Sequence, residues 1–87
     1  FCQVERDGRV LVVTINRPEV LNALHRPASL ELERVFDQFA RDPELWLAII
    51  TGAGERAFCA GNDLKFQAQG NDATLPPTGF GGLTGRF

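Results

Sequence analysis

The stretch that decides the fold is TGAGERAFCAGNDL, residues 51–64, which continues the apolar run Leu47–Thr51. That run is short and rich in β-branched residues, which is typical of a strand buried on both faces. Glycines at positions 52, 54 and 61 then bend the backbone, and Asp63 is a good N-cap for a following helix. A glycine turn that leads into a helix N-terminus presents free backbone N–H groups. Such groups suit the binding of an oxyanion or a phosphate.

Toward the N-terminus, two strand-like runs are joined by a turn. The runs are Phe1–Glu5 and Val10–Ile15, and the Asp7-Gly8 pair between them is a strong hairpin signal. Val10–Ile15 is apolar at nearly every position, which predicts a central strand. Pro18 ends it, because proline has no N–H to donate to a ladder.

The next segment predicts an amphipathic helix from Pro27 to about Arg41. Its helically spaced apolar positions are Ala28, Leu32, Val35, Phe36, Phe39 and Ala40. Glu31 and Glu33 point to different sides of such a helix, so we expect a solvated face and not a catalytic pair. A strand, a helix and a second strand in this order predict a right-handed crossover between parallel strands. The glycine loop then lies at the carboxyl edge of the sheet, where ligands usually bind.

Size and charge narrow the class of protein. Eighty-seven residues allow one small domain, which is either marginal alone or part of something larger. A hydrophobic fraction of 44%, a charged fraction of 23% and a net charge of −2 indicate a globular protein without the basic face that nucleic-acid binding needs. The apolar runs are too short for a membrane span. We therefore expect neither nucleic acid nor membrane as a partner.

The reactive side chains are few. Cys2 and Cys59 show no metal-ligand spacing, and two free thiols favour a reducing compartment, hence the cytoplasm. Cys59 lacks a paired base, since the single histidine, His25, stands far away near a helix start. We interpret Cys59 as a small buried thiol and His25 as a surface or cap-adjacent imidazole. No metal constellation is predicted.

Two motifs together resemble the N-terminal part of the enoyl-CoA hydratase/isomerase, or crotonase, family. They are INRPEVLNAL at residues 15–24 and AIITGAGERAFCAGNDL at residues 48–64. The resemblance runs from about Val4 to Lys65, and the tail PPTGFGGLTGRF, residues 76–87, is similar to carnitinyl-CoA dehydratase-like members. It implies an α/β fold: the N-terminal portion of a ClpP/crotonase-like ββαβ spiral core, incomplete in these residues.

The resemblance also implies roles for individual residues. The backbone amide of Asn62 becomes an oxyanion-hole donor, and the Ala60 carbonyl lies against the adenine. Ala23 and Leu24 are expected to pack the helix. The full set of implied substrate contacts is Arg17, Val20, Leu21, Ala60, Gly61, Asp63, Leu64 and Lys65. Coenzyme A enters as part of the substrate, and no separate cofactor is implied.

For the parent protein, the resemblance implies a lyase of fatty acid metabolism that binds an acyl-CoA. It stabilises the thioester enolate and adds or removes water across C2–C3. Isomerases, dehydratases, decarboxylases and hydrolases of the family use the same oxyanion hole, so the sequence does not decide which of these reactions the parent protein catalyses. A second hole amide, one or two glutamates and trimerisation helices are expected in sequence beyond these residues. We accordingly expect an inactive isolated chain and a parent that is a homotrimer or a dimer of trimers.

Several alternatives remain open. Residues 1–69 form the predicted domain, and residues 70–87 are expected to be a flexible Gly/Pro-rich loop, either a flap or a truncated end. A noncatalytic, truncated module that binds or assembles with a partner fits the same sequence. So does a dinucleotide-binding domain, because Gly52-x-Gly54-x-x-Ala57 matches its fingerprint; that motif requires a helix opening at Gly54. Arg17 and Lys65 have a plainer interpretation as surface charges.

Overall fold

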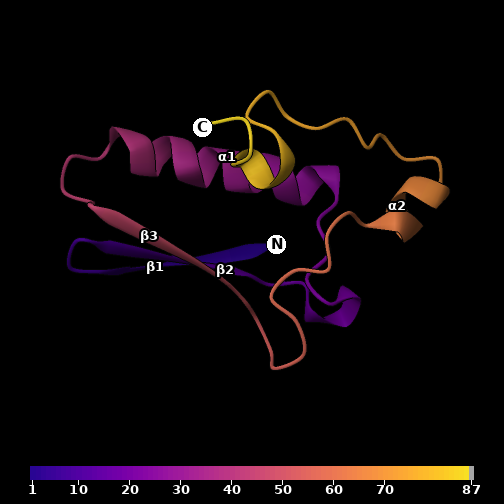
Figure 1. The fold of residues 1–87 in the computed structure, drawn as a ribbon, viewed down its shortest axis with the longest axis horizontal. Coiled ribbons are helices and arrows are strands. Elements are labelled where there is room, and N and C mark those ends of the chain that lie inside the picture. The colour runs from indigo at the N-terminus through magenta and orange to yellow at the C-terminus, as the bar shows by residue number, and fades with distance from the viewer. Residues whose placement is uncertain (87) are drawn as a thin grey trace.

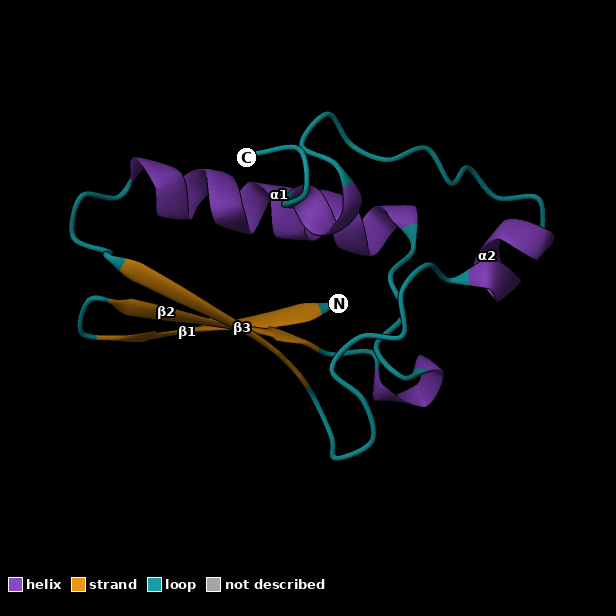
Figure 2. Ribbon diagram, viewed as in Figure 1, coloured by secondary structure: helices purple, strands orange, loops and turns teal. Residues whose placement is uncertain are grey.

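The computed structural model describes residues 1–86, which fold into a three-stranded sheet covered by one long helix (Figures 1 and 2). The elements are β1 (Cys2–Asp7), β2 (Val10–Ile15), the 3-10 turn η1 (Pro18–Val20), α1 (Arg26–Arg41), β3 (Leu47–Gly52), α2 (Leu64–Ala68) and the 3-10 turn η2 (Phe80–Gly82). The predicted α/β class and ββαβ order are confirmed.

The sheet has the order β1-β2-β3, so β2 is central as predicted. β1 and β2 pair antiparallel from Cys2 opposite Ile15 to Asp7 opposite Val10, which makes β1 two residues longer than expected at its C-terminal end. β2 and β3 pair in parallel, and their carboxyl ends meet where Ile15 lies beside Gly52. The segments that follow both strands therefore emerge at the same edge of the sheet.

α1 packs along one face of this sheet (Figure 2). Alternate residues of β2 point toward it, and the buried core is Leu11, Val13, Ile15, Leu24, Ala28, Leu32 and Phe36. The helical period of the apolar residues predicted this contact, since they line one stripe of α1. His25 caps the helix, because its Nδ1 accepts a hydrogen bond from the Ala28 amide at 3.2 Å.

The exposure of β3 differs from the prediction. The strand was expected to be buried on both faces, yet exposed and half-buried residues alternate along it, and Leu47 and Ile49 are 54% and 47% exposed. Ala48 and Ile50 pack against the core under α1. The reason is that α1 covers one face of the sheet, whereas residues 1–86 supply no element for the other.

The burial of the two glutamates on α1 also differs from the prediction. Glu31 and Glu33 were expected to be solvated, but both are half-buried and hydrogen-bonded. Glu31 Oε1 accepts from the Cys2 amide and from its Sγ, each at 3.1 Å. Glu33 Oε2 accepts from the amide and the hydroxyl of Thr78. The two carboxylates thus tie different segments to α1.

The last part of the chain returns to α1. η2 lies against the helix (Figure 1), where the Gly81 amide donates to Ser29 Oγ at 3.2 Å and Arg86 Nη2 lies 2.8 Å from Asp37 Oδ1. The expected flexibility of residues 70–87 stays a prediction, with Phe87 outside the described residues.

Candidate functional site

The glycine loop begins where β3 ends. Residues 53–63 have no regular structure, and the next helix, α2, starts only at Leu64 and has five residues. The helix that a dinucleotide fingerprint opens at Gly54 is thus missing from the described chain. Asp63 caps α2 as predicted, since its Oδ1 accepts from the Phe66 amide at 3.0 Å. So short a helix has little macrodipole, which makes loop amides the main donors at this edge.

The direction of the Asn62 amide follows from the pairing of two loops. Leu24 forms an isolated parallel bridge with Asn62: the Leu24 amide donates to the Gly61 carbonyl at 2.8 Å, and the Asp63 amide donates to the Leu24 carbonyl at 2.9 Å. The Gly61 carbonyl and the Asn62 N–H belong to one planar trans peptide, in which they point in opposite directions. The Asn62 N–H therefore points away from Leu24, and no acceptor within residues 1–86 bonds it.

Asn22 holds the start of the glycine loop. Its side chain is 1% exposed; Nδ2 donates to the carbonyls of Ala53 and Ala57, each at 2.9 Å, and Oδ1 accepts from the Arg17 amide at 2.9 Å. Sequence reasoning missed this residue, although it lies within the INRPEVLNAL motif. Its signal is chemical: Asn carries both a donor and an acceptor and tolerates the left-handed backbone found here, with φ at 57°.

Arg17 is not the solvated surface charge of the plainer interpretation, and its guanidinium already has partners within the chain. The residue is 9% exposed; Nη2 lies 3.1 Å from Asp63 Oδ2, and Nη1 donates to the Ala23 carbonyl at 2.5 Å. The Phe66 amide, with Arg17 as a further contributor, lowers the pKa of Asp63 below its ordinary value. Asp63 is thus an anchored carboxylate and a poor proton acceptor. We call Arg17, Asn22 and Asp63, with the backbone groups they hold, the loop clamp.

The other predicted contact residues surround the clamp with varied exposure. Val20, Leu21 and Gly61 are half-buried, whereas Ala60, Leu64 and Lys65 are exposed. The Ala60 amide donates to the Leu21 carbonyl at 3.1 Å, so both loops that carry these residues run side by side. Whether each touches a substrate stays a prediction.

No hydrogen bond joins Cys59 to His25 within residues 1–86. Cys59 is half-buried against the core, which is less burial than expected. His25 uses Nδ1 for the helix cap, and its ring meets those of Phe1 and Phe66 at 4.5 Å and 4.9 Å between centroids. The pKa of His25 is lowered mainly by burial and next by the positive charge of Arg17. The lower pKa favours the neutral ring, which the cap requires. Residues 1–86 contain no group of three or more potential metal ligands.

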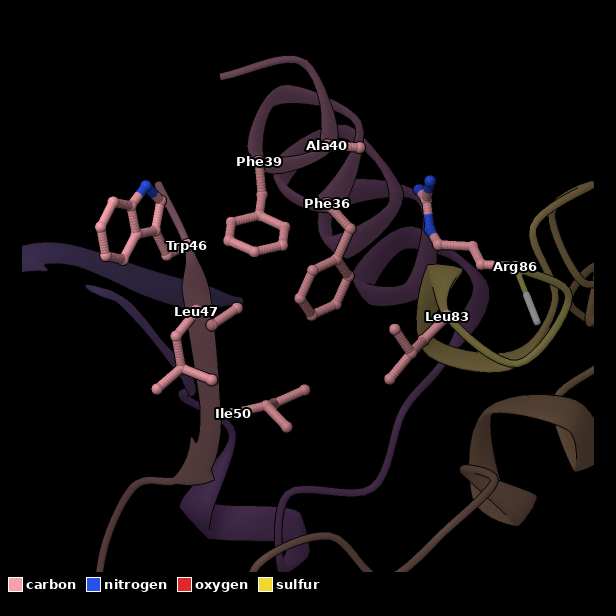
Figure 3. A pocket seen from close by; sticks show the side chains of 9 residues that line it. Phe36, Phe39, Ala40, Trp46, Leu47, Ile50, Leu83 and Arg86 are labelled. Atoms are coloured by element: carbon pink, nitrogen blue, oxygen red, sulfur yellow. The ribbon is translucent and has the colours of Figure 1, made fainter. Parts of the chain in front are cut away.

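A sizeable hollow lies elsewhere, between α1 and β3 (Figure 3). It has a volume of about 490 Å³ and is lined by Phe36, Phe39, Ala40, Trp46, Leu47, Ala48, Ile50, Leu83 and Arg86. We call it the apolar groove. The Arg86 guanidinium of this lining is held by Asp37. Of the described helices, none is both long enough and apolar enough for a membrane crossing.

The fold and the loop clamp define a class: an α/β unit with a free, oriented loop amide at the carboxyl edge of its parallel strands. The family model of Enoyl-CoA hydratase/isomerase matches residues 5–81, and the chain belongs to this family. It is 49% identical over 84 residues to the carnitinyl-CoA dehydratases of Escherichia coli K12 and Citrobacter koseri, which covers 94% of this chain and 32% of each relative.

Solved structures give the same result. The crystal structure of a carnitinyl-CoA hydratase from Mycobacterium avium superposes with a TM-score of 0.87 at 40% identity, over 93% of this chain and 32% of that one. An enoyl-CoA hydratase from Mycobacterium tuberculosis H37Rv gives a TM-score of 0.86 at 41% identity, over 98% and 33%. The chain spans about a third of the length of these relatives.

Proposed function

We propose that the protein containing these residues acts on an acyl-CoA. It stabilises the enolate of the thioester and adds or removes water across C2–C3. The observation that supports this most directly is the Asn62 amide, which points away from Leu24 and has no acceptor within residues 1–86. An amide held in place beforehand stabilises a developing oxyanion without reorganisation, and loss of one such donor slows related reactions by about 100-fold to 1,000-fold.

In this proposal the substrate lies along the two adjacent loops. Val20 and Leu21 contact the pantetheine side, the Ala60 carbonyl meets the adenine, and Lys65 attracts a phosphate. Gly61, Asp63 and Leu64 border the same path. The resemblance also implies Arg17 as a contact, but Asp63 and the Ala23 carbonyl already engage its guanidinium, so we do not place it on this path.

Proton transfer requires groups outside the described residues. Asp63 is the carboxylate next to the Asn62 amide, but Phe66 and Arg17 occupy its two oxygens. The family resemblance implies one or two glutamates and a second hole amide in the remaining two thirds of the family's length. We therefore propose that residues 1–87 alone are inactive, and that the parent is a cytoplasmic homotrimer or dimer of trimers.

The relatives named carnitinyl-CoA dehydratase favour dehydration of a 3-hydroxyacyl-CoA as the direction of the reaction. The test is turnover of crotonyl-CoA and of carnitinyl-CoA by the full-length protein, followed by the absorbance of the conjugated thioester. We expect turnover of at least one of them. No turnover with any acyl-CoA tried contradicts the proposal.

The amide itself is tested by a matched pair of variants. Asn62→Pro removes the N–H, so we expect kcat to fall by about 100-fold or more. Asn62→Ala keeps the N–H and is expected to retain kcat within about threefold, because the side chain is not the donor. Equal losses in both variants would place the function of Asn62 in its side chain. Circular dichroism checks that both variants fold.

A noncatalytic module that assembles with a partner is the second candidate, and the apolar groove is the observation that favours it. Trp46 and Leu47, on its wall, are 73% and 54% exposed. Apolar surface of this kind promotes association. Dye binding and light scattering of the isolated chain, together with an absence of turnover in the full-length protein, would support this candidate.

A further inference from the structure

Arg17 is bonded through both its backbone and its side chain at the glycine loop, and these contacts suggest a role other than ligand binding. Its amide donates to Asn22 Oδ1, Nη1 donates to the Ala23 carbonyl, and Nη2 pairs with Asp63 Oδ2. The side chain is 11% exposed, and the Phe1 ring lies 5.8 Å from its guanidinium carbon. Little of the guanidinium is left to meet a phosphate from solvent.

The residue that Arg17 grips lies next to the proposed oxyanion donor. Asp63 directly follows Asn62, and its amide is bonded to the Leu24 carbonyl. On the other side of Asn62, Gly61 has a φ of 98°, a backbone conformation that only glycine adopts freely. With a permissive glycine before it, the Asn62 peptide depends on Asp63 and on the Leu24 bridge for its direction.

We propose that Arg17 is a positioning residue, which through its buried ion pair with Asp63 holds the Asn62 amide in the direction required for oxyanion binding. It is not a ligand of the coenzyme A phosphates. This inference rests on the proposed function, because it names what orients the amide on which that function depends.

The experiment uses the full-length protein with Arg17→Gln, Asp63→Asn and the double variant Arg17→Gln/Asp63→Asn. Removing one member of a buried pair leaves the other uncompensated, so the single variants can unfold. The double variant leaves two neutral, hydrogen-bonding side chains and keeps the test valid in that case. Arg34→Gln, on an exposed part of α1, is the matched control.

Two readouts separate positioning from phosphate binding. The first is kcat and KM with an acyl-CoA and with the same acyl group on pantetheine, which has no phosphates. We expect Arg17→Gln and Asp63→Asn to lower kcat by about tenfold or more on both substrates, with KM within about threefold. The double variant should lose no more than the worse single variant, because the two residues act as a unit.

The second readout is the infrared carbonyl stretch of a bound ¹³C-labelled thioester, which falls when the oxygen accepts hydrogen bonds. In the variants we expect it to move back toward its value in solution. Two results overturn the proposal. One is a rise in KM confined to the acyl-CoA and to Arg17→Gln. The other is a lower melting temperature with unchanged kcat and carbonyl stretch, which means that the ion pair is only structural.

A failure of the proposed function can be told apart from a failure of this inference, because the first is seen already in the wild-type protein and the second only in the variants. If the wild type neither turns over an acyl-CoA nor lowers the carbonyl stretch, the function fails and this inference falls with it. If the wild type does both and the variants match it, only the inference about Arg17 is overturned. The Arg34→Gln control should match the wild type in every readout.

Discussion

The loop clamp and the apolar groove lie on the same small sheet but are built from opposite chemistry. In the clamp, Arg17, Asn22 and Asp63 are each at most 9% exposed and have polar partners. In the groove, Trp46 and Leu47 are 73% and 54% exposed and line a hollow of about 490 Å³. The groove is therefore large and apolar, whereas the clamp consists of buried, paired polar groups.

This difference shows that a large hollow need not be the part of the molecule with the most specific contacts. A ligand is oriented by a few fixed polar groups. The polar side chains of the clamp are bonded within the chain, and the Asn62 amide beside them has no acceptor within residues 1–86. The groove supplies apolar area, which promotes packing of almost any apolar partner. The two regions make different predictions for substitution, since buried polar networks are sensitive to single changes and exposed apolar surface is not.

The largest effect is expected for Gly52→Ala, at the end of β3. A Cβ there would stand 2.8 Å from both the Ala57 carbonyl oxygen and Asn22 Nδ2, and closer still to the Phe58 carbonyl oxygen. The backbone on that side has no room to yield, so we expect the free energy of unfolding of the full-length protein to fall by about 3 kcal/mol. Thr51→Ala, one residue earlier and exposed, should change it by less than about 0.5 kcal/mol. Equal effects in denaturant titrations would show that the loop is not tightly packed.

Asn22→Asp should have the next largest effect. The substitution keeps the acceptor for the Arg17 amide but removes both donations to the Ala53 and Ala57 carbonyls. Buried acceptors without partners cost about 1 to 3 kcal/mol, so we expect a loss near 2 kcal/mol in the same titration. An unchanged free energy of unfolding would mean that water replaces these hydrogen bonds. The clamp would then be no more sensitive to substitution than the groove.

His25 predicts a pH dependence at the edge of the clamp. Burial and the positive charges of Arg17 and of the Phe1 ammonium group lower the pKa of its ring, whereas a backbone hydrogen bond and Asp63 raise it, and the lowering prevails. Its pKa is lowered in the folded state, so the folded protein binds this proton less readily than the unfolded chain does. The stability contribution is present above pH 6.5, the ordinary pKa, and decreases as the pH falls below it.

Because His25 is the single histidine of the chain, His25→Asn isolates this effect. Asparagine keeps an oxygen acceptor for the α1 cap but does not titrate, so the variant should lose the His25 contribution to the decline between pH 7 and pH 5. Loss of the cap altogether, as in His25→Ala, should cost about 1 kcal/mol at pH 7. The measurement is the denaturation midpoint as a function of pH. An unchanged slope in His25→Asn would contradict the assignment.

The smallest effect on stability is expected in the groove. Leu47→Gln changes an exposed side chain, so the free energy of unfolding of the isolated chain should change by less than about 0.5 kcal/mol. Binding of an apolar dye and self-association of the same chain should decrease, because apolar surface is removed. A loss of stability as large as that of Asn22→Asp would show that Leu47 is internal, and the comparison would fail.

Local patterns predicted the framework well, and the misses have physical causes. The hairpin at Asp7-Gly8, the central position of β2 and the Asp63 cap depend on neighbours in sequence and were predicted. Glu31 was wrongly expected to be solvated, because a helical wheel does not show that Cys2 meets that face. β3 was wrongly expected to be covered on both faces, since its composition does not show which layers are present.

The amino-acid sequence by itself determined the ββαβ order, the position of the glycine loop at the carboxyl edge and the family. These features follow from hydrophobic period, turn residues and motifs, which are read along the chain. Only the tertiary structure decided that Arg17 pairs with Asp63, that Asn22 holds the Ala53 and Ala57 carbonyls, and which way the Asn62 amide points. The two carbonyls that Asn22 binds lie 31 and 35 positions from it along the chain. Spacing does not encode such contacts, because the crossing of the two loops creates them.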